Sequence, residues 1–215
     1  MVRKSNSGSN RAAVRPRRAV VPDRRGRRAL AMRQTVLRAA AQVFRRRGFA
    51  ATGMRDIAVA ADLSAGNLYY YFTSKHELLF FCQDHSLDRM LATCRAVGSS
   101  DAAAGERLGR VIRAHVGCML DELDGAAAHT EVESLPPRLR SRIVAKRDRY
   151  EATVRRIVEE GVRSRAFAPC DPTLVTRALL GALNWTARWY RPDGEQPPAA
   201  IADAFATYLV RGLVR

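Results

Sequence analysis

Apolar residues recur at every third or fourth position from about residue 28 to the C-terminus, which is the spacing of helices with one buried face. Val36, Ala40 and Phe44, for example, fall on one face of a helix, and Arg38 falls on the opposite face. The alternation of apolar and polar residues that marks strands does not exceed chance, and the sequence contains no internal repeat. A chain of 215 residues has room for one large domain or two small ones. The sequence therefore predicts an all-α protein.

Capping signals set the expected bounds of these helices. Gly48 stands where a C-terminal cap takes a left-handed conformation, so the first helix is expected to end near residue 47. Thr52 is placed to cap a short second helix over residues 54–61, and Ser64 a third over residues 65–72. Ser74 and Glu77 form a capping box that opens a long fourth helix. Further helices are expected over residues 103–123, more weakly near 127–134, and over 137–163, 172–190 and 198–215.

Composition and motifs exclude several classes of protein. No apolar run approaches the roughly 18–20 residues of a membrane span, and no apolar segment follows the basic N-terminus as it does in a secretory signal. The four cysteines form no Cys-x-x-Cys pair, which fits a reduced compartment better than a disulfide framework. We therefore expect a cytoplasmic protein without membrane contact. The sequence also lacks a Gly-x-Ser-x-Gly motif, a phosphate-binding loop and a dinucleotide fingerprint, so no enzymatic activity and no cofactor are expected.

Positive charge is concentrated at the N-terminus. The chain has 37 basic and 21 acidic residues and a formal net charge of +16. Residues 1–30 hold ten of the basic residues and a single acidic one, Asp23. We expect residues 1–27 to form a disordered basic tail, because their small and polar side chains cannot build a core. Such a tail attracts nucleic acid by releasing counterions from phosphates.

Residues 54–72 contain the parts of a helix-turn-helix in the right order: a short support helix, a sharp turn at residues 62–64, and an outer helix. Leu68 and Phe72 lie four residues apart and take the inward face of the outer helix. Tyr69, Tyr70 and Tyr71 are consecutive, so they cannot all point into a core. At least one of them faces outward, where its hydroxyl can reach a phosphate and its ring a thymine methyl.

Several fixed residues at fixed spacing then carry a family resemblance. They are Gly48-x-x-x-Thr52, Asp56-Ile57-Ala58, Ser64-x-Gly66-x-Leu68-Tyr69-x-x-Phe72 and Ser74-Lys75-x-x-Leu78. This pattern resembles the N-terminal DNA-binding domain of the TetR family of transcriptional regulators, over about residues 28–80. The family usually has glycine in the turn, where this chain has Asp62, a residue that tolerates a left-handed backbone.

The resemblance implies roles for the matching positions. Thr52 and Lys75 are expected to contact phosphates, Tyr69 and Tyr71 the DNA backbone, and Tyr70 the bases. The remaining residues of the expected DNA-binding set are Gly53, Arg55 and Ser64, together with Ala65, Gly66 and Asn67 at the front of the recognition helix.

Family architecture implies that residues 81–215 form a helical bundle for effector binding and dimerisation. Residues 147–151 and 181–194 are similar to the branch of the family that senses acyl-CoA thioesters. The last two helices are expected to form the homodimer interface, where Ala178, Gly181 and Ala182 would permit close approach beside Leu174 and Leu209. The candidate effector-binding residues are Met90, His115, Met119, Tyr150, Asn184 and Trp185.

The sequence thus predicts an N-terminal three-helix helix-turn-helix domain followed by a C-terminal bundle. Its expected function is that of a ligand-responsive regulator, a repressor that binds a palindromic operator in double-stranded DNA as a homodimer and is released by a small apolar or acyl-CoA effector. Two alternatives stay open. One is a metal-responsive regulator of the same fold, using Cys82-x-x-His85 and His115-x-x-Cys118, although no metal is the leading expectation. The other is a non-specific nucleic-acid-binding protein that acts through its tail.

Overall fold

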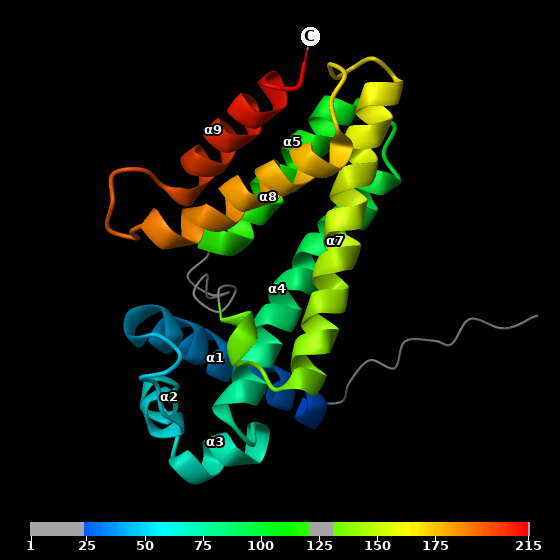
Figure 1. Ribbon diagram of the computed structural model, residues 1–215. Coiled ribbons are helices and arrows are strands. Elements are labelled where there is room, and N and C mark those ends of the chain that lie inside the picture. The colour runs from blue at the N-terminus through cyan, green and yellow to red at the C-terminus, as the bar shows by residue number, and fades with distance from the viewer. Residues whose placement is uncertain (1–23, 121–130, 215) are drawn as a thin grey trace, which may run out of the picture.

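The computed structural model describes residues 24–120 and 131–214 and is all helical in those ranges, as the sequence predicts (Figure 1). None of the described helices combines the length and apolar character that crossing a membrane requires. The helices are α1 (Arg24–Arg47), α2 (Met54–Ala60), α3 (Ala65–Tyr71), α4 (Lys75–Gly98), α5 (Ala104–Leu120), α7 (Pro137–Arg163), α8 (Pro172–Trp189) and α9 (Pro198–Arg211), with a 3-10 turn, η1 (Val132–Ser134), before α7.

Helices α1, α2 and α3 and the first turns of α4 form the N-terminal unit (Figure 1). Gly48 ends α1 with a φ of 75°, and its amide donates to the carbonyl of Phe44 at 2.8 Å. Ser64 and Ser74 cap α3 and α4 by accepting hydrogen bonds from the third residue of each helix. The unit has a continuous apolar interior, formed by Val36, Ala40, Phe44, Phe49, Ile57, Leu68, Phe72 and Leu78.

Helix α4 joins the N-terminal unit to the rest of the molecule, and α7 runs beside it (Figure 1). Lys146 of α7 fixes this contact, because its ammonium lies 2.5 Å from a carboxylate oxygen of Asp84 and 2.8 Å from one of Asp88. All three side chains retain some exposure to water, so solvent screening keeps the contribution of this cluster small. The element that follows the recognition helix is thus tied to the C-terminal bundle.

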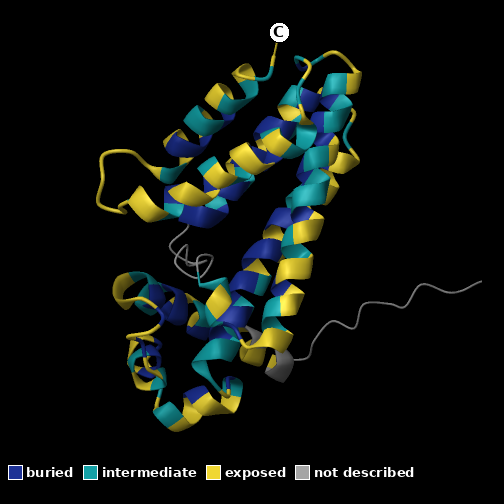
Figure 2. Ribbon diagram, in the orientation of Figure 1, coloured by how far each residue is buried: buried dark blue, intermediate teal, exposed yellow. Residues whose placement is uncertain are grey.

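In the C-terminal bundle α5 lies at the centre, in contact with α4, α7, α8 and α9. Figure 2 shows the buried residues on the faces that these helices turn toward one another. Gly161 of α7 permits a close approach, because a Cβ at this position would lie 2.1 Å from the ring of Phe167. Asp171 caps α8 through hydrogen bonds to the amides of Thr173 and Leu174, as predicted from its place before Pro172.

Most expected helix bounds agree with the structure within three residues. Helix α1 begins at Arg24, so residues 24–27, which were expected to be disordered, are helical. The rest of the expected tail lies outside the described residues, as does most of the weak helix expected near 127–134, whose end forms η1. The prediction that Thr52 caps α2 is wrong. Gly53 is the N-cap, and the Asp56 carboxylate accepts a hydrogen bond from the Gly53 amide at 2.8 Å.

Candidate DNA-reading surface and effector cavity

Helix α3 presents a polar and aromatic face to solvent. Leu68 is fully buried and anchors the helix, whereas Tyr70 is 81% exposed and Tyr69 is 51% exposed. Gly66 and Asn67, at the front of the helix, are exposed as well. This face matches the geometry that a recognition helix needs, with its N-terminal residues and outer side chains free to enter a major groove.

The other predicted positions around α3 differ in accessibility. Tyr71 is only partly exposed, and its ring meets that of Tyr70 edge to face at 5.1 Å between centroids. Ala65 is partly buried, while Ser64 is exposed with its hydroxyl oxygen held by the amide of Asn67 at 3.2 Å. The structure therefore brings these positions to one end of the N-terminal unit, with Tyr70 the most exposed of the tyrosines.

The turn before α3 has the strained conformation that the sequence predicts. Asp62 has a φ of 54°, a value that only glycine, asparagine and aspartate adopt readily. The amide of Leu63 then donates to the carbonyl of Ala58 at 2.9 Å, which closes the turn. Gly53 and Arg55, at the start of α2, are exposed on the same unit.

Two residues that were expected to contact phosphate are engaged inside the protein. Thr52 is 2% exposed, and its hydroxyl donates to the carbonyl of Gly48 at 2.7 Å. The Lys75 ammonium donates to the carbonyls of Phe49 and Thr52 at 3.1 Å each and of Ala50 at 3.3 Å. It also lies 4.6 Å from the centroid of the Phe49 ring. These contacts hold the α1–α2 connection together, and we predict that they, rather than phosphate contacts, are the main role of both side chains.

Arg33 supports the far end of the recognition helix, a role that the sequence does not indicate. Its guanidinium lies 5.1 Å from the ring centroid of Phe72 and 5.0 Å from that of Phe81. Phe72 ends α3 and Phe81 belongs to α4, so one α1 side chain contacts both helices. Cation–π contacts of this kind contribute about 0.5–1 kcal/mol each at partly exposed sites.

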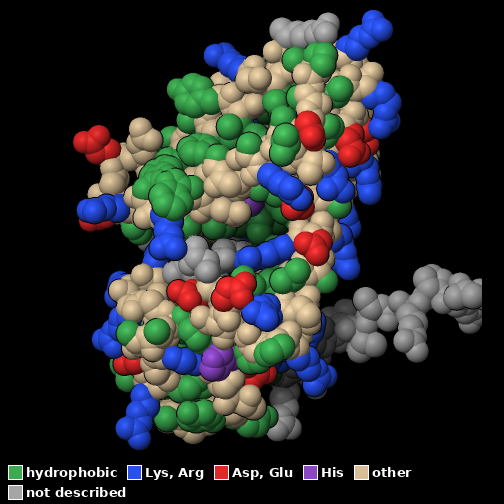
Figure 3. Space-filling view, viewed as in Figure 1, with side chains coloured by type: hydrophobic (Ala, Val, Ile, Leu, Met, Phe, Trp, Pro, Cys, Tyr) green, Lys and Arg blue, Asp and Glu red, His purple; other side chains and the backbone are tan. Residues whose placement is uncertain are grey.

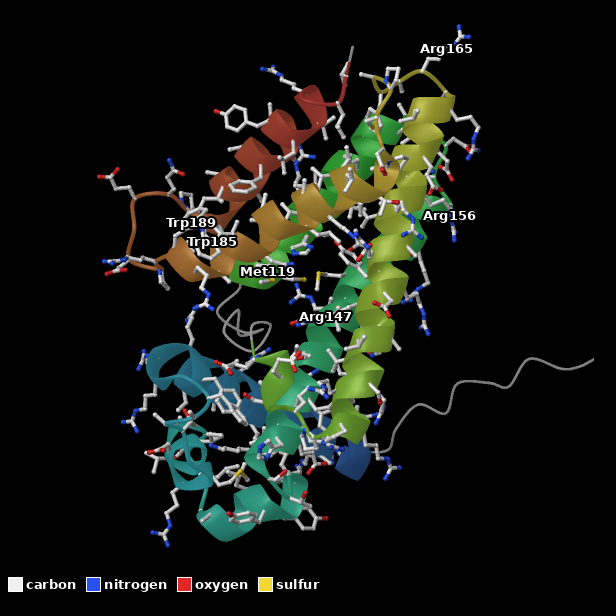
Figure 4. The ribbon with its side chains drawn as sticks, viewed as in Figure 1. Met119, Arg147, Arg156, Arg165, Trp185 and Trp189 are labelled. Atoms are coloured by element: carbon white, nitrogen blue, oxygen red, sulfur yellow. The ribbon has the colours of Figure 1, made fainter. Side chains whose placement is uncertain are left out.

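A cavity of about 420 Å³ lies in the C-terminal bundle, between α4, α5, α7 and α8. Figure 4 shows Met119 of α5 and Arg147 of α7 extending toward this space. The structure brings five of the six candidate effector-binding residues to its wall: Met90, His115, Met119, Tyr150 and Asn184. Leu87, Leu180 and Gly181 add apolar surface.

Three polar side chains from three helices form a hydrogen-bonded chain on the cavity wall. The hydroxyl of Tyr150 lies 3.1 Å from Nδ1 of His115, and Nε2 of His115 lies 3.2 Å from Oδ1 of Asn184. Burial lowers the pKa of His115 to about 4, so the imidazole is neutral at pH 7. Burial likewise raises the pKa of the Tyr150 hydroxyl, which keeps its proton. The chain is therefore uncharged.

Charged residues outside the candidate effector-binding set also line the cavity. Arg147 precedes Tyr150 by one helical turn on α7, and Arg177 precedes Asn184 by two turns on α8. Glu151 also lines the cavity, with a carboxylate oxygen 3.8 Å from the Arg177 guanidinium. Burial lowers the pKa of Arg147, but an arginine remains charged at pH 7 because its pKa starts above 12. The residues that line this part of the cavity thus include two cations and one carboxylate, and Glu133 acts electrostatically on Arg147.

Trp185 is the one candidate effector residue that the structure places elsewhere. It does not line the cavity, and 64% of its surface is exposed. Figure 4 shows Trp185 and Trp189 together toward the C-terminal end of α8. Leu174 of α8 is 62% exposed and Tyr208 of α9 is 72% exposed. Figure 3 shows hydrophobic side chains gathered over α8 and α9, so Trp185 belongs to an exposed apolar surface.

The proposed metal ligands do not come together. Within residues 24–120 and 131–214, no group of three or more His, Cys, Asp or Glu side chains could hold a metal ion. The thiol of Cys82 donates to the carbonyl of Leu37 in α1 at 3.7 Å, whereas His115 belongs to the cavity wall in the bundle. The two helical pairs thus lie in different parts of the fold.

Comparison with known proteins agrees with this architecture. Residues 36–80 match the model for bacterial regulatory proteins of the tetR family, and residues 101–213 match a tetracyclin repressor-like C-terminal domain. The HTH-type transcriptional repressor KstR2 of Rhodococcus jostii is 27% identical over 190 residues, which cover 84% of this chain and 90% of that protein.

Solved structures show the same likeness over most of the chain. The regulator PfmR from Thermus thermophilus is 33% identical, with a TM-score of 0.75, and the match covers 84% of this chain and 99% of that one. The ketosteroid transcriptional regulator KstR2 of Mycobacterium tuberculosis is 27% identical, with a TM-score of 0.77 and coverages of 85% and 95%. With both domains matched in order, this chain belongs to the TetR family of bacterial transcriptional regulators.

Proposed function

We propose that this regulator is a homodimeric repressor that binds a palindromic operator and is released by an anionic small molecule of the acyl-CoA class. The observation that carries the proposal is the pairing, in one chain, of an exposed recognition helix with a cavity of about 420 Å³ whose wall includes part of α4. As an operator-binding protein it works in the cytoplasm, where a bacterial chromosome lies.

The DNA-reading part of the proposal rests on α3. Gly66 and Asn67 meet base edges from the front of the helix, and Tyr69 and Tyr70 supply hydroxyls for phosphates and rings for thymine methyl groups. Gly53 and Arg55, at the start of α2, lie where a backbone contact adds affinity without sequence preference. Two such surfaces must be held about 34–36 Å apart to enter successive major grooves.

The dimer part of the proposal rests on the exposed apolar surface of α8 and α9. Leu174, Ala178 and Trp185 recur at offsets of four and seven residues, so they form one stripe along α8. A small residue in the middle of such a stripe lets two helices approach closely. A stable dimer buries about 800 Å² on each partner, and large exposed aromatic side chains such as Trp189 and Tyr208 supply such contact area.

The release part of the proposal rests on α4. Leu87 and Met90 line the cavity, and α4 begins at Lys75, directly after the recognition helix. Leu87 lies 12 residues into that helix, an axial rise of about 18 Å. A ligand that fills the cavity better when α4 is displaced favours a different spacing of the two recognition helices. The factor by which operator affinity falls is then set by the ratio of the ligand's affinities for the two states.

The experiment starts from an operator selected from random duplexes and measured by fluorescence anisotropy. Tyr70→Ala should weaken operator binding at least tenfold while leaving the dimer mass unchanged in light scattering. Trp185→Glu should give a monomer and lose operator binding with it. Val144→Glu is the matched control, because Val144 is an exposed apolar residue on α7, which supplies neither the reading surface on α3 nor the apolar surface of α8 and α9, and it should change neither measurement.

Three results would contradict the proposal. An unchanged operator affinity in Tyr70→Ala removes the DNA-reading surface, and an unchanged mass in Trp185→Glu removes the dimer surface. For the effector, saturating octanoyl-CoA should release wild-type protein from the operator and raise its melting temperature. An absence of both effects rejects the acyl-CoA class.

A further inference from the structure

We infer that the cavity selects effectors whose acyl group carries a neutral oxygen function, a ketone or a hydroxyl, remote from the anionic end. This inference rests on the proposed effector-binding function and specifies its ligand. The observation behind it is the order of side chains along α8. Arg177, Leu180, Gly181 and Asn184 share one face at offsets of three, four and seven residues, and all four line the cavity.

Along that face the wall changes from cationic to apolar to polar. Arg177 and Asn184 are separated by seven residues, an axial rise of about 10 Å. Leu180 and Gly181 lie between them and offer no hydrogen-bonding side chain. A complementary ligand therefore has an anionic group, a hydrocarbon segment of about this length and a second polar group.

The polar end is the chain of Tyr150, His115 and Asn184. A neutral imidazole has one donor and one acceptor, so the Asn184 oxygen at Nε2 requires the proton to be on Nε2. Nδ1 then accepts from the Tyr150 hydroxyl. In this arrangement the lone pairs of the Tyr150 oxygen and the N–H groups of the Asn184 amide remain available to a ligand.

The chain can also be reversed as a unit. When the Asn184 amide turns over, its nitrogen donates a hydrogen bond to Nε2 of His115, and Nδ1 of His115 donates to the Tyr150 oxygen. The Tyr150 hydroxyl keeps its proton and can then donate it in a hydrogen bond toward the cavity. One arrangement thus offers a donor from Asn184 and the other a donor from Tyr150. A carbonyl oxygen accepts from either end, and a hydroxyl can bind in both arrangements, but a methylene group can bind in neither.

The charges around the chain separate its role from that of the arginines. His115 and Tyr150 are 3% and 4% exposed and carry no charge at pH 7, so this end does not attract an anion. The anionic group belongs with Arg147 and Arg177, the two cationic side chains that line the cavity. A hydrocarbon placed against the polar chain would displace water from the Asn184 amide without replacing its hydrogen bonds, and this loss discriminates against purely aliphatic acyl groups.

The test compares two thioesters of the same length, octanoyl-CoA and 7-oxooctanoyl-CoA, by titration calorimetry on the full chain. Wild-type protein should bind 7-oxooctanoyl-CoA at least about tenfold more tightly. Tyr150→Phe and Asn184→Leu should each bring the ratio of the two dissociation constants toward one, mainly by weakening the oxo compound. Tyr190→Phe is the matched control: Tyr190 follows α8 outside the cavity wall, and its loss of a hydroxyl should leave the ratio unchanged.

The outcomes distinguish the inference from the function on which it rests. Equal binding of both thioesters overturns the inference and leaves the acyl-CoA proposal standing. A large ratio that survives both substitutions overturns it too, because the discrimination then arises elsewhere. If neither thioester binds, the acyl-CoA class is rejected. The inference is then tested by the same comparison with the free acids octanoate and 7-oxooctanoate. Equal binding of these acids, or no binding of either, overturns the inference as well.

Discussion

Removing the ammonium of Lys75 should loosen the N-terminal unit without removing a phosphate contact. The change is Lys75→Met, which keeps an unbranched side chain of similar length and deletes the charge. In the structure this ammonium donates to three carbonyls at 3.1–3.3 Å and lies over the Phe49 ring. These carbonyls belong to the connection between α1 and α2, so the substitution frees the segment that positions the support helix.

The magnitude follows from the accessibility of those carbonyls. Hydrogen bonds to a charged group contribute about 1.5–3 kcal/mol each where water is excluded. Two of the three bonds are part-buried and the third is exposed, so water replaces much of what is lost. We take about 2 kcal/mol for the whole site. For a chain of this size that lowers the melting temperature by about 4–8 °C, and it bounds the loss of operator affinity at about 30-fold per subunit.

Two measurements separate this role from a phosphate contact. A residue that neutralises a phosphate contributes about one to the slope of log affinity against log salt, whereas a residue that acts inside the protein leaves the slope unchanged. Lys75→Arg is the second variant. A phosphate accepts either cation, but a planar guanidinium cannot reproduce a point charge shared by three carbonyls. An unchanged melting temperature with a salt slope reduced by about one in Lys75→Met, restored in Lys75→Arg, would refute this reasoning.

Three further predictions concern the bundle and its cavity. Gly161→Ala should lower the melting temperature by several degrees, because its Cβ would overlap the Phe167 ring, whereas Gly117→Ala, with open space around it, should be neutral or stabilising. The free energy of unfolding should fall by up to about 3 kcal/mol as pH decreases from about 6.5 to 4, because unfolded His115 binds a proton that the folded form excludes. Urea titrations of wild type and His115→Gln at several pH values check this prediction. If the free energy of unfolding of His115→Gln depends on pH as steeply as that of wild type, the prediction is contradicted. Arg177→Gln should weaken octanoyl-CoA binding about fivefold in calorimetry, and equal affinity in the variant would place the anion elsewhere.

The fold and the exposed face of α3 could be predicted because their signals are local. A capping serine acts on an amide three residues away, and a left-handed turn depends on one residue, so Ser64, Ser74 and Asp62 are all legible in the sequence. Helical periodicity likewise identified Leu68 as an inward residue. The internal hydrogen bonds of Thr52 and Lys75 could not be predicted, because residue type alone does not reveal which carbonyls a side chain meets once α1 and α4 have packed together.

The cavity was only half predictable, for a physical reason. Polar residues on apolar helix faces, such as His115 and Asn184, stand out against their surroundings, and both line the wall. Arg177 does not stand out, because a charged residue on an amphipathic helix normally lies in solvent, and Arg147 was indicated only by the resemblance of residues 147–151. Trp185 was misplaced for the opposite reason: an aromatic residue on a helix is expected to be buried, but here it is exposed on the surface proposed for a second subunit.

The position of α4 makes the two halves of the molecule dependent on each other. Its first turn carries Lys75 against the α1–α2 connection, and its middle carries Leu87 and Met90 against the cavity. A straight helix transmits a displacement along its length, because changing its backbone breaks hydrogen bonds in every turn. Lys146 meets α4 at Asp84, between these two contacts, so it is placed to act as the pivot. Substitutions at either end of α4 should therefore couple energetically, although the two ends share no contact.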